Sequence, residues 1–79
     1  MKIERTGIGW GVTKDWPVFD CSYDVWYKGK KYAVEARYDL NRITIETFYK
    51  NKLIKNKTIK DAVEKEFKAT LEKFLGRKV

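Results

Sequence analysis

The sequence contains no histidine and only one cysteine among its 79 residues. Without histidine, the chain lacks the commonest general base and the commonest metal ligand of proteins. Its single cysteine, Cys21, can form neither a disulfide within the chain nor a zinc site. We therefore expect a protein that is not an enzyme, with no catalytic residues, no bound metal and no cofactor.

Long apolar runs are also missing. No run is long enough to cross a bilayer, and the segment MKIERTGIG lacks the hydrophobic core of a signal peptide. A secreted domain of this size would usually need disulfides, which a lone cysteine cannot supply. These features favour a single small cytoplasmic domain over residues 1–79 that does not contact membranes.

Acidic residues are few relative to basic ones. Eleven aspartates and glutamates stand against 18 lysines and arginines, which gives a formal net charge of +7. This balance permits nucleic acid or an acidic protein surface as a partner and disfavours mimicry of DNA. Lysine predominates over arginine, the commonest reader of guanine, so the sequence favours backbone-driven binding over sequence-specific recognition of a duplex.

What the chain does contain, over most of residues 1–50, is alternation of apolar and polar side chains, which is typical of strands. Two-residue turns are expected at Lys28–Gly29 and Leu40–Asn41, because glycine and asparagine tolerate positive φ. These turns delimit antiparallel strands at 18–27, 31–38 and 42–50. The resulting register sets apolar residues opposite each other, as in the pairs Val25 with Tyr32, Tyr23 with Val34, Cys21 with Ala36, and Tyr38 with Ile43.

The segment TGIGWGV, residues 6–12, has glycine at every second position. We expect it to form a fourth strand over 6–13, joined to the next strand through KDWP (14–17). This connection predicts the pairs Val12 with Phe19, Trp10 with Cys21, and Ile8 with Tyr23. The glycines then lie on the outer face of the sheet, where missing side chains allow strong coiling. The alternatives are a mobile arm or a face that receives a partner's backbone.

Residues 59–75 have the apolar periodicity of a helix. Thr58 and Asp61 form a capping pattern at its start, and Gly76 is suited to the C-terminal cap. The fold class predicted is therefore α+β, a four-stranded antiparallel meander packed against one C-terminal helix (β-β-β-β-α). Because a helix about 10 Å wide covers roughly two strands spaced about 4.8 Å apart, the sheet must curl or leave apolar surface bare.

Carboxylates gather on the outer face of the expected sheet, at Asp20, Asp24, Glu35 and Glu46. A polar face with ion pairs is the interpretation we favour, and metal binding by these four residues is the alternative. Cys21 is expected to be a buried, inert thiol beside Trp10 and Ala36.

Two aromatic residues, Trp26 and Phe48, interrupt the polar pattern of the outer face. Lysines surround the same end of the sheet and continue through KNKLIKNK (50–57). Rings within a positive surface suit single-stranded nucleic acid, because bases stack on rings for about 1–3 kcal/mol each while lysines neutralise phosphates. The candidate binding residues are Trp26, Lys28, Lys30, Lys31, Phe48, Lys50, Lys52, Lys55 and Lys57. Alternatively, residues 1–6 cover the two rings, with Arg5 over the indole, and the lysines serve solubility.

The leading hypothesis is a non-enzymatic module that binds nucleic acid, single-stranded or without sequence preference. The alternative is a protein-binding inhibitor or accessory protein, for example one encoded by a phage or another mobile element against a host complex. Trp26 and Phe48 would then anchor an acidic protein surface, with the lysines as a polar rim. We expect a monomer; a homodimer through the edge of strand 42–50 or through uncovered core face is the alternative.

Overall fold

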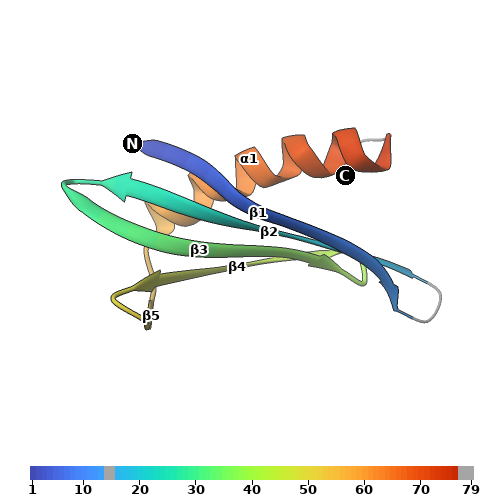
Figure 1. Cartoon of the computed structure of the whole chain (residues 1–79), viewed down its shortest axis with the longest axis horizontal. Coiled ribbons are helices and arrows are strands. Elements are labelled where there is room, and N and C mark those ends of the chain that lie inside the picture. Colours follow the sequence, from blue (N-terminus) through green and yellow to red (C-terminus); the bar gives the residue numbers. More distant parts are fainter. Residues whose placement is uncertain (14–15, 77–79) are drawn as a thin grey trace.

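The computed structural model of the chain describes residues 1–13 and 16–76, and the side chains of 1–11 and 18–76. Within this part of the chain, five strands form one antiparallel sheet in the order β1-β2-β3-β4-β5, followed by a helix. The elements are β1 (Lys2–Thr13), β2 (Trp16–Tyr27), β3 (Lys30–Asp39), β4 (Arg42–Tyr49), β5 (Lys52–Ile54) and α1 (Lys57–Leu75). Figure 1 shows α1 lying across one face of the sheet. The α+β class, with an antiparallel sheet against a C-terminal helix, is confirmed.

The expectation of four strands is wrong, because the segment after Tyr49 forms a further hairpin. Lys50 and Asn51 adopt positive φ angles of 50° and 65°, so the chain reverses within two residues. Phe48 then pairs with Leu53, and Thr47 with Ile54. The short strand β5 thus covers one end of β4, whose edge is not free there, and this removes part of the edge considered for a homodimer.

The other two expected turns are confirmed. Lys28 and Gly29 have φ angles of 51° and 74°, and Leu40 and Asn41 have 52° and 61°. Two consecutive positive φ angles match the right-handed twist of the flanking strands. The predicted registers between β2 and β3 and between β3 and β4 follow from these turns, as Val25 opposite Tyr32 and Tyr38 opposite Ile43 show.

The predicted register of β1 is wrong by two residues. Trp16 and Pro17, expected in the connection, begin β2, so the connection is confined to residues 14–15, which lie outside the described residues. The shorter connection pairs Trp10 with Phe19 and Ile8 with Cys21. A shift of two keeps every side chain on its expected face, because strand side chains alternate with a period of two. Val12 pairs with Pro17.

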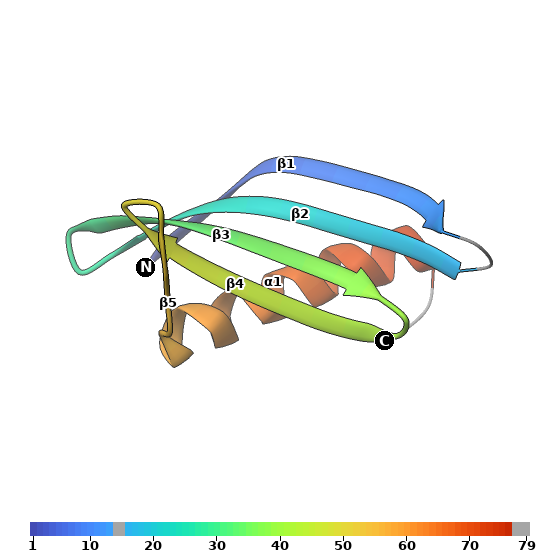
Figure 2. The same cartoon turned by 90° about the horizontal axis from the view of Figure 1, so that it is seen from below.

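A β-bulge between Arg5 and Gly7 interrupts β1. Arg5 pairs with Tyr23 across the bulge, on the face of the sheet that carries the helix, whereas Lys2 pairs with Trp26 on the outer face. The start of β1 at Lys2 extends the strand beyond the predicted 6–13, and its pairing with β2 rules out a mobile arm for the described residues. Figure 2 shows β1 as the outermost strand on one side of the sheet.

The core lies between α1 and strands β2 and β3. Four helix residues are fully buried against it: Ile59, Val63, Phe67 and Leu71. The Phe67 ring stacks on that of Phe19, with ring centroids 5.7 Å apart. From the sheet, the buried residues include Cys21, Val25, Val34 and Ala36.

The helix leaves β1 bare. Ile8 and Trp10 lie on the helix side of the sheet, yet their exposed fractions are 56% and 67%. Phe74 of α1 is 41% exposed and contacts the Trp10 ring at 5.6 Å between centroids. The coiling expected from the glycines therefore does not bring β1 under the helix.

The helix begins two residues before the predicted start, and its cap differs from the expected one. The Asn56 side chain accepts a hydrogen bond from the Ile59 backbone N–H at 3.1 Å, so Asn56 rather than Thr58 is the N-cap. Asp61 instead pairs with Lys57, N to O 2.6 Å. The C-cap is Gly76, as predicted, with φ 71° and its N–H donating to the Glu72 carbonyl. No helix among the described residues is long and apolar enough to cross a membrane.

Candidate nucleic-acid interface

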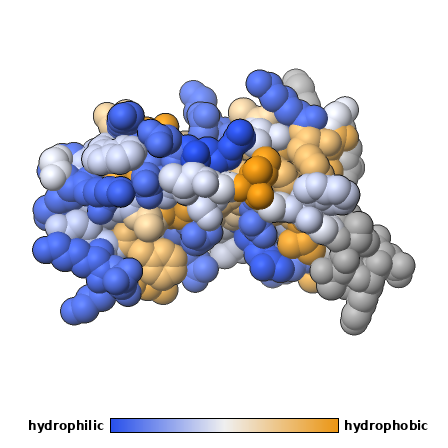
Figure 3. All heavy atoms as spheres, in the orientation of Figure 1, coloured by the Kyte–Doolittle hydropathy of each residue, from blue (hydrophilic) through white to orange (hydrophobic). Residues whose placement is uncertain are grey.

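The β2–β3 and β4–β5 turns lie at the same end of the sheet, next to the start of β1 (Figure 1). Two-residue turns hold their lysines close to the strand ends rather than on long loops. We refer to this region as the basic end; its lysines are Lys2, Lys28, Lys30, Lys31, Lys50 and Lys52. Hydrophilic side chains dominate this end in Figure 3, and apolar surface becomes visible further along the molecule.

Trp26 lies on the outer face at the basic end and is half-buried. Its strand neighbours are Lys2 on β1 and Lys31 on β3. Their ammonium nitrogens lie 5.0 Å and 5.7 Å from the ring centroid, respectively. The start of β1 therefore does cover this ring, through Lys2 and not through Arg5, which pairs with Tyr23 on the other face.

Phe48 lies on the same face, in a row across the sheet between Ala33 and Leu53. Leu53 is 63% exposed, so this row ends in an apolar side chain open to solvent. The sequence interpretation missed Leu53 because it treated residues 50–57 as a lysine-rich segment without a strand. Phe48 and Leu53 provide an apolar surface on the same face of the sheet as Trp26, on strands β4 and β5.

Two tyrosines extend the aromatic surface onto the helix side of the basic end. Lys28 lies 5.4 Å from the Tyr27 ring centroid, and Lys30 and Lys50 each lie 5.5 Å from that of Tyr49. Five of the six lysines are thus placed over three rings. At exposed sites such cation–π contacts contribute about 0.5–1 kcal/mol each, which is weak enough for a ligand to displace the lysine.

Two of the candidate lysines have a carboxylate partner. Lys31 forms an ion pair with Asp24 at 3.5 Å, and Lys57 forms one with Asp61 at 2.6 Å. The hydrogen bond from Lys57 and the charge of Asp61 raise the pKa of Lys57. A lysine held by an acid is a poorer phosphate ligand, so Lys57 contributes less than its sequence position suggests.

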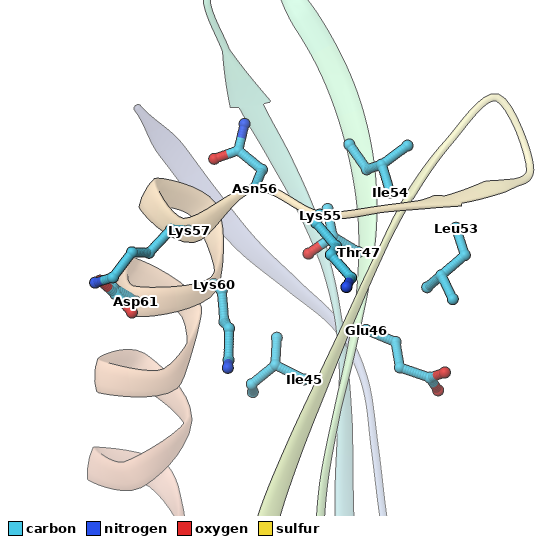
Figure 4. A pocket seen from close by; sticks show the side chains of 10 residues that line it. All are labelled: Ile45, Glu46, Thr47, Leu53, Ile54, Lys55, Asn56, Lys57, Lys60 and Asp61. Carbon is cyan, nitrogen blue, oxygen red and sulfur yellow. The ribbon is translucent and has the colours of Figure 1, made fainter.

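The structure does not bring Lys55 and Lys57 to the basic end. After β5 the chain turns toward α1, and both residues instead line a groove of about 510 Å³ between β4, β5 and the start of the helix. In Figure 4, Lys60 extends from α1 toward Ile45 of β4, and Lys57 and Asp61 lie together at the start of the helix. The candidate site therefore divides into the basic end, which holds seven of the nine predicted residues, and this groove.

The outer-face carboxylates form the expected rows. Ser22, Glu35 and Glu46 are consecutive partners across β2, β3 and β4. Ser22 donates a hydrogen bond to Glu35 at 2.8 Å. Among the described residues, no group of three acidic, cysteine or histidine side chains is placed to hold a metal ion, so the geometry supports a polar surface there.

Cys21 is fully buried beneath the helix, next to Ala36 as predicted and to Ile8 rather than Trp10. Burial raises the pKa of its thiol above the ordinary value of 9.0. Since the thiolate is the reactive form of cysteine, this environment disfavours nucleophilic chemistry at Cys21.

Comparison with known proteins finds no matching protein-family model, no matching curated protein and no matching solved structure.

Proposed function

We propose that this protein binds nucleic acid through the basic end, without sequence preference and with a preference for single strands. The observation that carries the proposal is the placement of five of the six lysines of the basic end over the rings of Trp26, Tyr27 and Tyr49. Lysines supply the phosphate contacts that dominate affinity for nucleic acids, and rings supply faces on which unpaired bases stack.

The lysine–ring contacts suggest how binding proceeds. A base that stacks on Trp26 gains about 1–3 kcal/mol, whereas each displaced cation–π contact costs only about 0.5–1 kcal/mol. The displaced ammonium group of Lys2 or Lys31 stays within reach of the adjacent phosphate. Binding thus exchanges contacts within the protein for stronger contacts with the ligand.

Salt dependence provides the test. If five phosphates are neutralised, the logarithm of the binding constant should fall with the logarithm of salt concentration with a slope of about −3.5 for single strands and about −4.5 for duplexes. The assay is a fluorescence titration with short single- and double-stranded oligonucleotides between about 50 and about 200 mM salt, over which phosphate contacts weaken strongly.

Two triple variants that lose the same charge distinguish the contribution of the basic end to binding from that of net charge. Lys28→Ala/Lys30→Ala/Lys50→Ala should reduce the slope for single strands by about 2, since three phosphate contacts are lost at about 0.7 each. Lys65→Ala/Lys68→Ala/Lys73→Ala removes the same charge from the helix and should leave the slope nearly unchanged. Equal effects of the two triples, or no binding by the wild type at about 50 mM salt, would contradict the proposal.

The row formed by Phe48 and the exposed Leu53 favours one second candidate, a module that binds an acidic protein surface. Apolar side chains at the centre of such an interface carry most of its energy, and charged side chains form the rim. Leu53→Ala should then abolish a salt-tolerant interaction, whereas it should change a salt-sensitive interaction with single strands much less.

A further inference from the structure

The strand β1 has a free edge and an exposed apolar face. Within the described residues, β1 pairs with β2 on one side and with no strand on the other. On its helix side, Ile8 and Trp10 are 56% and 67% exposed, and Phe74 of α1 adjoins the Trp10 ring. Apart from Phe74, the helix side chains do not cover this part of β1, so apolar surface that alternation would place in a core faces solvent.

The edge of β1 is protected against further pairing over only half of its length. Charged residues and the bulge occupy its first part, up to Arg5. From Gly7 to Thr13 it carries no charge, no proline and no bulge, which are the features that block edge pairing in natural sheets. At the opposite edge, β5 is three residues long and carries Lys52, and the part of β4 that β5 does not cover has charged residues at both ends, Arg42 and Glu46. The second half of β1 is therefore the longest unprotected edge segment of the sheet.

Glycines keep the outer face of this segment flat. A Cβ atom on Gly11 would meet no atom within 4 Å, and one on Gly7 would lie 3.7 Å from Ser22. Neither position has a positive φ angle that would require glycine. Gly7 adjoins the bulge after Arg5, where glycine is common. The fold of the single chain leaves Gly11 unexplained, and close approach of another backbone is one recognised reason for glycine within a strand.

We propose that β1 pairs with β1 of a second copy of this chain, antiparallel and centred on Gly9. This arrangement sets Gly9 opposite Gly9, Gly7 opposite Gly11, and Ile8 opposite Trp10 of the second copy. Because opposite residues in an antiparallel pair share a face, the exposed Ile8 and Trp10 side chains of both copies lie together on the helix side. The result is a continuous sheet of ten strands with a two-fold axis, and the inference does not depend on nucleic-acid binding.

Charge favours a second copy arranged in this way, despite a net charge of +7 on each chain. The paired segment is neutral, so like charges do not meet at the interface. Antiparallel pairing also sends the two basic ends in opposite directions. Lys2 lies seven residues from the axis, so it and its copy are roughly 46 Å apart at about 3.3 Å per residue, several times the screening length of about 8 Å in physiological salt.

The interface is small, which sets its expected strength. It comprises one strand edge and the side chains of Ile8, Trp10 and Phe74 from each copy, less than the roughly 800 Å² per partner of a standard interface. The dimer should therefore dissociate on dilution, with a dissociation constant of about 1–100 µM, in the range of weak complexes.

Light scattering coupled to size-exclusion chromatography, from about 10 µM to about 1 mM protein, tests the proposal across the range of weak dimers. The wild type should shift from monomer to dimer. Ile8→Glu should weaken dimerisation by at least about tenfold, since it places a charge opposite an apolar ring at the paired edge. Leu53→Glu makes the same change of charge at a comparably exposed position on the opposite edge and should dimerise as the wild type does.

Hydrogen exchange identifies the contact itself. Amides of residues 7–11 should exchange more slowly at the high concentration than at the low one, because free N–H groups of the edge become hydrogen-bonded. Circular dichroism of both variants checks that they remain folded. A wild type that stays monomeric at about 1 mM, a dimer insensitive to Ile8→Glu, or protection confined to β5 would each overturn the proposal.

Discussion

β1 and β2 are neighbouring strands of equal length with the same alternation, yet their helix-side faces differ. Phe19 and Val25 on β2 are at most 1% exposed, whereas Ile8 and Trp10 on β1 are more than half exposed. Both strands present apolar residues toward the same side, and only β2 lies beneath α1. Alternation thus determines which face a side chain joins, and the position of the single helix determines whether that face is buried.

The difference has an energetic meaning. Burial of a large apolar side chain contributes about 1.5–3 kcal/mol to folding, so the stability of this chain is concentrated between α1 and strands β2 and β3. The exposed residues Ile8 and Trp10 of β1 contribute little to folding of the monomer and remain available for association.

Phe67→Ala should lower the free energy of unfolding by about 3–5 kcal/mol, because it removes a fully buried ring that stacks on Phe19. Trp10→Ala removes a larger ring from the bare face, and the loss should remain below about 1 kcal/mol. Urea unfolding at low protein concentration measures both. Similar losses for the two variants would place the β1 face within the core.

Glycines of the two regions should respond with opposite sign. Gly29→Ala should cost about 1–2 kcal/mol, because Gly29 has a φ of 74° in the turn after β2. Gly11→Ala should stabilise the monomer by about 0.4–1 kcal/mol, since the new Cβ meets open space and the unfolded chain loses freedom. Thermal unfolding of dilute protein gives both values. Destabilisation by Gly11→Ala would show that the monomer itself needs a bare backbone there.

Substitutions at the start of α1, which packs on the sheet, should have a smaller effect on the free energy of unfolding. Asn56→Ala should cost about 1 kcal/mol, because it removes the side-chain oxygen that accepts the Ile59 N–H. Thr58→Ala, at the residue predicted from the sequence as the cap, should change stability by no more than about 0.5 kcal/mol. Chemical unfolding of both variants decides between the two caps; a larger loss for Thr58→Ala would favour the sequence-based cap.

The smallest effect on stability concerns pH. Burial raises the pKa of the Cys21 thiol in the folded chain, so the unfolded chain releases the proton first. Stability due to this group is therefore complete below pH 9.0, the ordinary pKa of the thiol, and is lost as the pH rises above it. Unfolding between pH 8 and pH 10 should show a decline that Cys21→Ala reduces; the same decline in both proteins would point to other groups.

Thiol labelling compares the reactivity of a cysteine beneath the helix with that of a cysteine on the exposed face of β1. In the folded chain at neutral pH, Cys21 should react slowly with a thiol reagent, because it is fully buried and protonated. Ile8→Cys in a Cys21→Ala background places a thiol on the bare face, where it should react rapidly in dilute protein. Slow reaction of both thiols would indicate that the β1 face is covered in the monomer.

The central strands could be predicted from the sequence because two independent signals agree there. Alternation over β2, β3 and β4 fixes their faces, and the turns at Lys28–Gly29 and Leu40–Asn41 fix their registers. For β1 only the first signal exists. Connections of two and of four residues keep the same faces, so alternation alone could not choose between the register found and the one predicted.

β5 was missed because three residues are too few to show a period. A local signal was nevertheless present, since Lys50–Asn51 repeats the turn chemistry of Leu40–Asn41, with asparagine in the second position. The prediction of the helix cap was wrong for a different reason. Asn56 and Thr58 are both good caps, and only the structure shows which one reaches a free N–H.

The residues of the candidate site also differ in how well the sequence predicted their positions. Trp26, Phe48 and the turn lysines come together because their positions follow from the predicted registers. Lys2 was missed because the first strand was expected to begin at residue 6, and its position over Trp26 depends on the extension of β1 to its first residues. Lys55 and Lys57 were wrongly grouped with the turns, because β5 redirects the chain before it reaches them.

The sequential order of the strands has a kinetic consequence. Each strand pairs only with the strand before or after it in the chain, and three of the connections are two-residue turns. Hairpins of this kind form within about 1–10 µs, and folds with such low contact order reach the native state rapidly. The docking of α1 on β2 closes a much longer loop than any of the strand pairings, so we expect it to be the late, rate-limiting step. Helix residues should then govern how fast the chain folds, whereas removal of β1 should change that rate little.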